Sequence, residues 1–266
     1  MKKKQKKNLD SKRIKIASEK WIEHARICGK KLLVLLYPQR CPFCDEVLGR
    51  KEKKELCCSA CKGKIPWVKD PVCLKCGKPV GSAEAEYCPD CQKSHHMFDQ
   101  GAAVFTYSGC MPGSIYRLKA SNRRDYIDFF AAAMKMQSGK YLKRWQPQVI
   151  VPVPMHPKKR AARGYNQAEL LAERVSELTG IPFDRNILCC IKKTKVQKSL
   201  GRSERQKNLR GSFVVQKDPG KLKRVLVIDD VYTTGSTMDE IARTLKNAGV
   251  EQVYFLVLCT GRGKKG

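Results

Sequence analysis

The feature that most constrains this chain is the string VLVIDDVYTTGST at residues 225–237. Its apolar start predicts a parallel strand that is buried on both faces of a sheet. Asp229 and Asp230 follow at the carboxyl end of that strand, where open α/β sheets bind their ligands. A Thr/Gly/Ser loop comes next, and a helix is expected from Met238 to Asn247. The loop amides would then face the positive end of a helix, which favours an anion.

Two interpretations of this unit remain open from its residues alone. In the first, the loop holds a 5′-phosphate and the two aspartates bind the 2′- and 3′-hydroxyls of a ribose. In the second, the aspartates and threonines are ordinary turn and cap residues, and Thr237 with Glu240 has the spacing of a capping box. The loop is not a Walker A loop, because no Gly-Lys-Ser/Thr follows, and it lacks a GxGxxG dinucleotide fingerprint.

The string as a whole resembles the phosphoribosyl pyrophosphate (PRPP) signature of type I phosphoribosyltransferases. That resemblance implies catalytic roles for Asp229 and Asp230. It also implies that the following loop residues bind PRPP: Thr233, Thr234, Gly235, Ser236 and Thr237.

The spacing of the cysteines indicates metal binding. Nine of the fourteen cysteines lie between residues 41 and 91, mostly as CxxC pairs. Two CxxC turns close a tetrahedral S₄ shell that suits Zn²⁺, and four ligands leave no open position, so two structural zinc sites are expected. Redox thiols, an iron–sulfur site and interleaved ligand pairs remain alternatives, as does Cys57 in place of Cys58. The expected ligands are Cys41, Cys44, Cys58 and Cys61 for one site, and Cys73, Cys76, Cys88 and Cys91 for the other.

Zinc is expected to stabilise the segment that carries these cysteines. Its removal should unfold residues 38–98 and leave much of the C-terminal domain folded. His95 and His96 follow the last CxxC pair and are interpreted as surface histidines rather than ligands.

Length and charge set further bounds. The 266 residues can hold one α/β domain and a smaller module. The formal net charge of +29 favours a polyanionic partner, nucleic acid first and an anionic membrane second, although a generically basic protein is the alternative. No stretch can span a bilayer, and the apolar residues 32–37 are too few and too late for a signal peptide, so we expect a cytoplasmic protein.

After residue 98 the pattern alternates between strands and helices. Strands are expected at 102–107 and 149–153, and helices after Arg124 and from about Ala168. Between the second strand and its helix lies the basic segment HPKKRAARGYNQ at residues 156–167, which is interpreted as a loop.

VPVPMHPKKRAARGYNQAELLA, taken with VIDDVYTTGST and the paired CxxC motifs, resembles the ComF family of competence-associated proteins. The resemblance implies an α/β fold: a type I phosphoribosyltransferase-like parallel sheet with helices on both faces, preceded by a small zinc-ribbon-like module. The expected boundaries are a basic extension at 1–37, the zinc module at 38–98 and the phosphoribosyltransferase-like domain at 99–266.

The same resemblance implies roles for other residues and partners. Arg160, Arg163 and Gly164 would bind the pyrophosphate of PRPP, since arginine can bond two phosphate oxygens at once. Residues 192–210 would form a lid that excludes water, and Mg²⁺ would accompany the diphosphate. Single-stranded DNA and a late-competence helicase are the implied partners. The alternative function is a metabolic phosphoribosyltransferase acting on an amine or nucleobase, without a DNA role.

Overall fold

The computed structural model describes residues 38–192 and 209–261, and its centre is a parallel sheet of four strands in the order β1-β6-β5-β2. The neighbouring strands pair in parallel throughout. Most of the expected lid, at residues 193–208, lies outside the described residues, as does the basic extension at 1–37. The four strands are β1 (Gln100–Thr106), β2 (Val149–Pro152), β5 (Arg224–Tyr232) and β6 (Gln252–Thr260).

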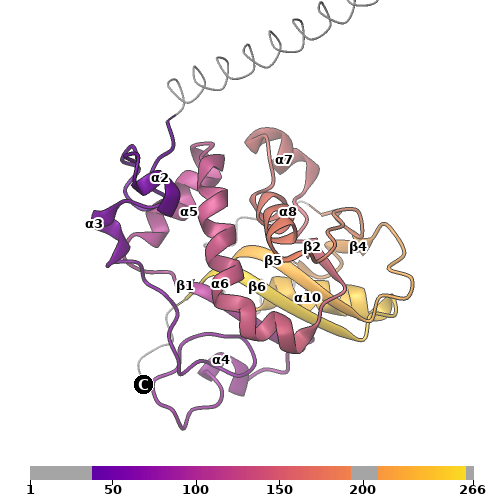
Figure 1. The fold of residues 1–266 in the computed structure, drawn as a ribbon. Helices are drawn as coiled ribbons and strands as arrows, with labels where there is room; N and C mark the ends of the chain where they lie inside the picture. Colours follow the sequence, from indigo (N-terminus) through magenta and orange to yellow (C-terminus); the bar gives the residue numbers. More distant parts are fainter. Residues whose placement is uncertain (1–37, 193–208, 262–266) are drawn as a thin grey trace, which may run out of the picture.

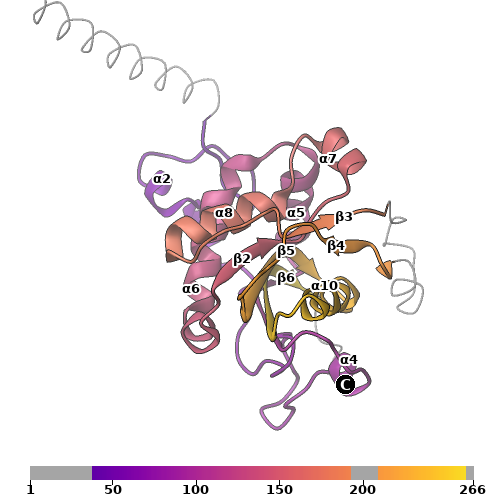
Figure 2. The ribbon, with the colours of Figure 1, turned by 90° about the vertical axis from the view of Figure 1, so that its right-hand side faces the viewer.

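Helices cover both faces of this sheet, as expected for parallel strands (Figures 1 and 2). One face carries α5 (Met111–Ala120), α6 (Ile127–Trp145) and α8 (Gln167–Thr179). The other carries α10 (Ser236–Asn247) and the small hairpin of β3 (Leu188–Cys190) and β4 (Phe213–Val215). The remaining short helices are α2 (Glu52–Glu55), α3 (Ser59–Lys62), α4 (Pro89–Gln92), α7 (Pro157–Arg163) and the 3₁₀ turn η1 (Arg124–Tyr126). The α/β architecture is therefore confirmed.

The sheet separates two hydrophobic clusters, because successive side chains of a strand point to opposite faces. Leu226 and Ile228 of β5 pack with α6 and α8, whereas Val225 and Val227 pack with α10. All four side chains are fully buried. The apolar run at the start of the string thus forms a central strand.

The two cysteine-rich units pack against opposite faces of the sheet (Figures 1 and 2). The first unit contains α2 and α3, and its Cys41 and Phe43 belong to the cluster on the α5–α6 face. The second unit contains α4, and its Cys73 and Cys76 belong to the cluster on the α10 face. The zinc module therefore has no hydrophobic core separate from that of the sheet in the described part of the chain.

The segment between these units also completes the sheet. The amide of Val68 donates to the carbonyl of Val104 at 2.9 Å, and the amide of Thr106 donates to the carbonyl of Pro66 at 2.9 Å. These bonds use backbone groups of β1 that β6 leaves unpaired, which protects an edge strand from pairing with another chain.

Local structure departs from the sequence-based expectations at two places. The segment 157–163 is a helix rather than a loop: Nδ1 of His156 accepts from the amide of Lys158 at its start, and Gly164 ends it at φ +83°. Helix α10 begins at Ser236 with Gly235 as N-cap, so the capping box of Thr237 and Glu240 is wrong.

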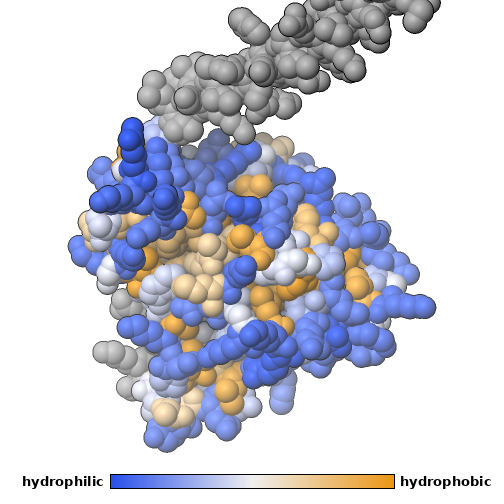
Figure 3. Space-filling view, in the orientation of Figure 1, coloured by the Kyte–Doolittle hydropathy of each residue, from blue (hydrophilic) through white to orange (hydrophobic). Residues whose placement is uncertain are grey.

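Hydrophilic side chains dominate the face seen in Figure 3, and hydrophobic ones form small separate patches between them. Across the described ranges, no helix has both the length and the apolar character needed to cross a bilayer.

Candidate ligand site and metal centres

The two aspartates of the string lie within β5, close to its carboxyl end. Asp230 is buried, and its carboxylate accepts two bonds from Lys119 of α5, at 2.9 Å to Oδ1 and 2.8 Å to Oδ2. Nε2 of Gln167, the first residue of α8, donates to Oδ2 at 2.6 Å. Asp229 is half-buried, and its Oδ1 accepts from the amide of Asp230 at 2.8 Å. Helices α5 and α8 thus contribute side-chain donors to Asp230, whereas Asp229 accepts from a backbone amide.

This difference sets the protonation of the site. Burial, followed by the negative charge of Asp230, raises the pKa of Asp229 from 3.8 to about 7, and Lys119 offsets part of that effect. Burial opposes the charge of Lys119, but Asp230 outweighs it and the pKa of Lys119 is raised. Burial and then the neighbouring Arg163 and Lys119 lower the pKa of Lys159. The site is therefore a compact cluster of opposite charges with limited access to water.

The loop at 233–237 leads from this acid pair into α10. Gly235 has φ +87°, a conformation that favours glycine, and it carries no side chain that could cap the helix. The first amides of an α-helix have no acceptor within the helix. Oγ1 of Thr234 and Oγ of Ser236 lie 3.1 Å apart at the same turn. The loop therefore presents amide and hydroxyl groups at a helix N-terminus, next to the acid pair.

The basic segment lies between β2 and α8, and its two arginines are already bonded. Arg160 donates to both carboxylate oxygens of Glu169, at 2.7 and 3.2 Å. Nη1 of Arg163 donates to Oε1 of Gln167 at 2.6 Å, and Gln167 in turn donates to Asp230. Arg163 is thus linked to the acid pair through one side chain, whereas Arg160 is oriented by an ion pair.

The cysteines form two groups of four, each with its sulfur atoms within 4.8 Å of one another. Sulfur–sulfur distances of 3.6 Å (Cys44 to Cys58) and 3.7 Å (Cys76 to Cys88) agree with the separation of about 3.8 Å for four sulfurs around Zn²⁺. Consecutive CxxC pairs share a group, and Cys58 rather than Cys57 joins the first. These donors fit two structural zinc ions that would cross-link the chain. The groups are Cys41, Cys44, Cys58 and Cys61, and Cys73, Cys76, Cys88 and Cys91.

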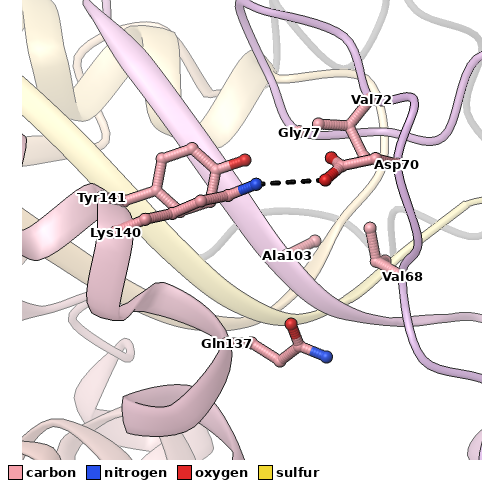
Figure 4. Close-up of a pocket in the computed structure, with 8 residues that line it drawn as sticks. All are labelled: Val68, Asp70, Val72, Gly77, Ala103, Gln137, Lys140 and Tyr141. Atoms are coloured by element: carbon pink, nitrogen blue, oxygen red, sulfur yellow. Dashed lines mark hydrogen bonds and ion pairs between the residues drawn. The ribbon is translucent and has the colours of Figure 1, made fainter.

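A small cavity lies away from this edge, between the zinc segment, β1 and α6 (Figure 4). Asp70 and Lys140 form an ion pair of 3.2 Å across it. Its volume of about 50 Å³ is room for a few water molecules and not for a sugar phosphate. The acid pair is not among the residues that line it.

Sequence reasoning missed Lys119, Gln167 and the environment of His96. Lys119 lies 111 residues before its partner Asp230, so no local pattern joins them. His96 was expected at the surface, but its side chain is fully buried and bonds to Asp239, so that interpretation is wrong, while His95 is exposed.

Two family models match the chain. The model of the double zinc ribbon domain matches residues 32–92, and the model of the phosphoribosyl transferase domain matches residues 128–266. The first covers both cysteine groups and the second covers the acid pair and its loop. The chain accordingly combines a double zinc ribbon with a type I phosphoribosyltransferase-like fold.

Curated relatives extend over most of the chain. Competence protein F of Haemophilus influenzae is 31% identical over 214 residues, which are 74% of this chain and 93% of the relative. Competence protein ComFC of Bacillus subtilis is 28% identical over 235 residues, which are 82% of this chain and 90% of the relative. Among solved structures, a purine phosphoribosyltransferase of Pyrococcus horikoshii aligns at 17% identity and a TM-score of 0.32, covering 50% of this chain and 74% of that one.

Proposed function

The chain belongs to the ComF family of competence-associated proteins, and on that premise we propose that its Asp229–Asp230 edge binds PRPP. The observation that carries the proposal is the contiguity of an acid pair, half-buried Asp229 and buried Asp230, with a glycine-containing turn at a helix N-terminus. A phosphorylated pentose needs both groups: carboxylates that accept hydrogen bonds from the sugar hydroxyls, and amides that donate to the phosphate.

Each part of the site has a distinct role in this proposal. The amides and hydroxyls of residues 233–237 hold the 5′-phosphate, and the two carboxylates accept from the ribose hydroxyls. Asp230 is already ordered by Lys119 and Gln167, so its position needs no rearrangement of β5. Arg163 lies one side chain away, on the side where the basic segment would meet the pyrophosphate. Arg160 must leave Glu169 before it can bind an anion.

Mg²⁺ fits the same edge, because carboxylate oxygens are its usual protein ligands. Bound there with PRPP, it would neutralise charge on the diphosphate. Lys119, Lys159 and Arg163 surround the acid pair and would add cationic groups of the protein itself. Displacement of pyrophosphate separates charge at the sugar, and fixed cations close to the leaving group stabilise that separation.

The proposed biological role is the handling of incoming single-stranded DNA during competence. The relatives carry competence names, and the net charge of +29 suits a polyanion. Aromatic side chains in the zinc segment mostly pack instead of facing solvent: Phe43 is buried and Trp67 lies on Phe105, while Tyr87 is exposed. A helicase partner remains a proposal from the family resemblance, and a transferase reaction with an amine or nucleobase remains the alternative function.

Calorimetric titration of the protein with PRPP, in the presence of Mg²⁺, tests the site. Asp230→Asn removes the charge that Lys119 and Gln167 hold, and we expect its affinity to fall at least tenfold. Asp70→Asn is the matched control, because Asp70 also pairs with a lysine but lies at the cavity of Figure 4. Equal affinity in the wild type and Asp230→Asn would remove the acid pair from the proposed site.

The salt dependence of single-strand binding tests the DNA role. Each phosphate contact adds about 0.7 to the slope of log K against log salt concentration. Deletion of residues 2–7, which carry five lysines, should lower that slope and leave PRPP affinity unchanged. An unchanged slope assigns the lysines to another partner. Pyrophosphate release that depends on an added amine or base, with no binding of single strands, favours the metabolic alternative.

A further inference from the structure

The segment that leaves the second cysteine group runs directly under the loop proposed to bind phosphate. Cys91 is the last cysteine of that group, and His96 and Met97 follow it in the chain. The ring of His96 stacks on Phe98, with centroids 4.7 Å apart, and its side chain is fully buried. This places His96 between the zinc ribbon and the N-terminus of α10.

Asp239, in the first turn of α10, is bound by this segment through both of its carboxylate oxygens. Nδ1 of His96 lies 2.8 Å from Oδ2, and the amide of Met97 donates to Oδ1 at 2.8 Å. The partners are separated by 143 and 142 residues in the sequence, so the contact joins two distant segments. We name this arrangement the His96–Asp239 clamp.

The clamp contacts the loop itself as well as the helix behind it. A Cβ on Gly235 would lie 2.8 Å from Cε1 of His96 and 2.8 Å from Oη of Tyr232. Those separations are shorter than van der Waals contact, so the imidazole and the phenol leave no room for a side chain there. The backbone of the loop therefore rests against His96 on one side, and its path depends on the position of that ring.

The ribbon of the second cysteine group also packs against Tyr232 and Phe98. Lys78 pairs with Asp90 at 2.6 Å within the ribbon, and its Nζ lies 5.5 Å from the centroid of the Tyr232 ring. Phe98 packs edge-on against Tyr232 at 6.2 Å. Cys73 and Cys76 are buried in the hydrophobic cluster that includes Phe98 and Tyr232. The ribbon, the clamp and the loop are thus one packed unit.

Two buried polar atoms in this unit add an independent observation. Within the described ranges, neither Nε2 of His96 nor Oη of Tyr232 has a hydrogen-bond partner. Both atoms belong to the side chains that pack against Gly235. Buried polar groups without partners cost folding free energy, so each one in a native structure calls for a structural or functional explanation.

We propose that His96 is a positioning residue through which the second zinc ribbon holds the 233–237 loop in its anion-binding shape. The proposal rests on the proposed PRPP site and adds a dependence of that site on a cysteine group that is distant from it in the sequence. Metal loss at Cys73, Cys76, Cys88 and Cys91 releases the clamp and thereby loosens the loop. The double zinc ribbon then helps to form the ligand site, because it holds the 233–237 loop in place.

Hydrogen exchange of the loop without ligand tests the clamp, using zinc-loaded full-length protein. In His96→Ala, the exchange rate of the backbone amides at residues 233–240 should rise at least tenfold, while the amides of β6 stay protected. His95→Ala is the matched control, because His95 is the exposed neighbour, and it should exchange like the wild type. His96→Asn keeps a donor near the position of Nδ1 and should restore most of the protection. Equal exchange in His96→Ala and His95→Ala would overturn the proposal.

A second variant and a second readout separate the clamp from general stability. Asp239→Asn keeps the volume of the side chain but weakens both clamp bonds, so it should loosen the same residues even if His96→Ala folds poorly. PRPP affinity should fall about tenfold or more in His96→Ala and Asp239→Asn, with zinc content unchanged at two per chain. Lost zinc in His96→Ala would instead make the histidine a support of the metal site and overturn the proposal. Failure of the wild type to bind PRPP would contradict only the proposed function, because hydrogen exchange of the loop is measured without ligand.

Discussion

At the residue scale, adjacent carboxylates of one strand have opposite environments. Asp230 is buried against Lys119 and Gln167, which stabilise its charge, whereas burial and the charge of Asp230 disfavour ionisation of Asp229. A carboxyl group whose pKa is strongly raised by burial and a neighbouring charge is typical of functional sites. Asp229 is therefore the residue whose charge changes near neutral pH.

We expect PRPP affinity in the presence of Mg²⁺ to rise with pH and to level off above about pH 7, the pKa of Asp229. The ionised carboxylate binds Mg²⁺ and sugar hydroxyls. Below pH 7, each decrease of one pH unit should therefore lower the affinity for PRPP by up to about tenfold. Calorimetry between pH 5.5 and pH 8.5 measures the profile. Asp229→Asn is the control for titration of PRPP itself, and parallel profiles in the two proteins would contradict this assignment.

The same shift has the opposite sign for stability. The pKa of Asp229 is raised on folding from 3.8 to about 7, so the folded chain retains a proton that the unfolded chain releases. This contribution is fully present below pH 3.8 and is lost as the pH rises through 7. Ligand affinity and this part of the folding free energy therefore change in opposite directions with pH.

At the scale of elements, local patterns predicted the strands and the acid pair because each depends on neighbouring residues. The apolar run at 225–228 has the period and composition of a central strand, and β5 contains it. The helix of residues 157–163 was missed because its basic residues carry no apolar stripe, and only a cap at each end defines it. Lys119 and His96 reach the site over more than 100 residues, which no local spacing records.

The contact between the second ribbon and β1 gives an element-scale prediction. Gly77 has φ +73°, and a Cβ there would lie 2.8 Å from both Cα of Ala102 and the carbonyl oxygen of Gly101. Those are backbone atoms, so Gly77→Ala must displace the ribbon from β1 and should cost at least about 1 kcal/mol of unfolding free energy. Urea unfolding measures the loss. Gly81→Ala is the control, since nothing lies within 4 Å of its Cβ. Equal midpoints for the two variants would show that the ribbon does not depend on this approach.

At the scale of the whole molecule, the two ribbons pack against opposite faces of one sheet and share its hydrophobic clusters. The sequence suggested a zinc module that could unfold alone. The packing of Cys41 and Phe43 on one face, and of Cys73 and Cys76 on the other, indicates a joint core instead. The boundary at residue 98 therefore separates two patterns in the sequence, but residues on both sides of it share hydrophobic clusters in the fold.

Zinc removal should therefore destabilise the sheet together with residues 38–98. Hydrogen exchange before and after chelation measures this, and we expect β1 to lose protection because residues 66–68 cover its edge. β3 and β4 form a separate two-stranded sheet, and their exchange gives an internal comparison. Unfolding of 38–98 alone, with β1 and β6 still protected, would support two independent domains.

A crystal structure with PRPP and Mg²⁺ tests the central claim most directly. We expect the 5′-phosphate on the amides of residues 233–237 and the ribose beside Asp229 and Asp230, with the imidazole of His96 still packed against Gly235. PRPP bound at another place, or absent at saturating concentration with Lys119 still bridging Asp230, would contradict it.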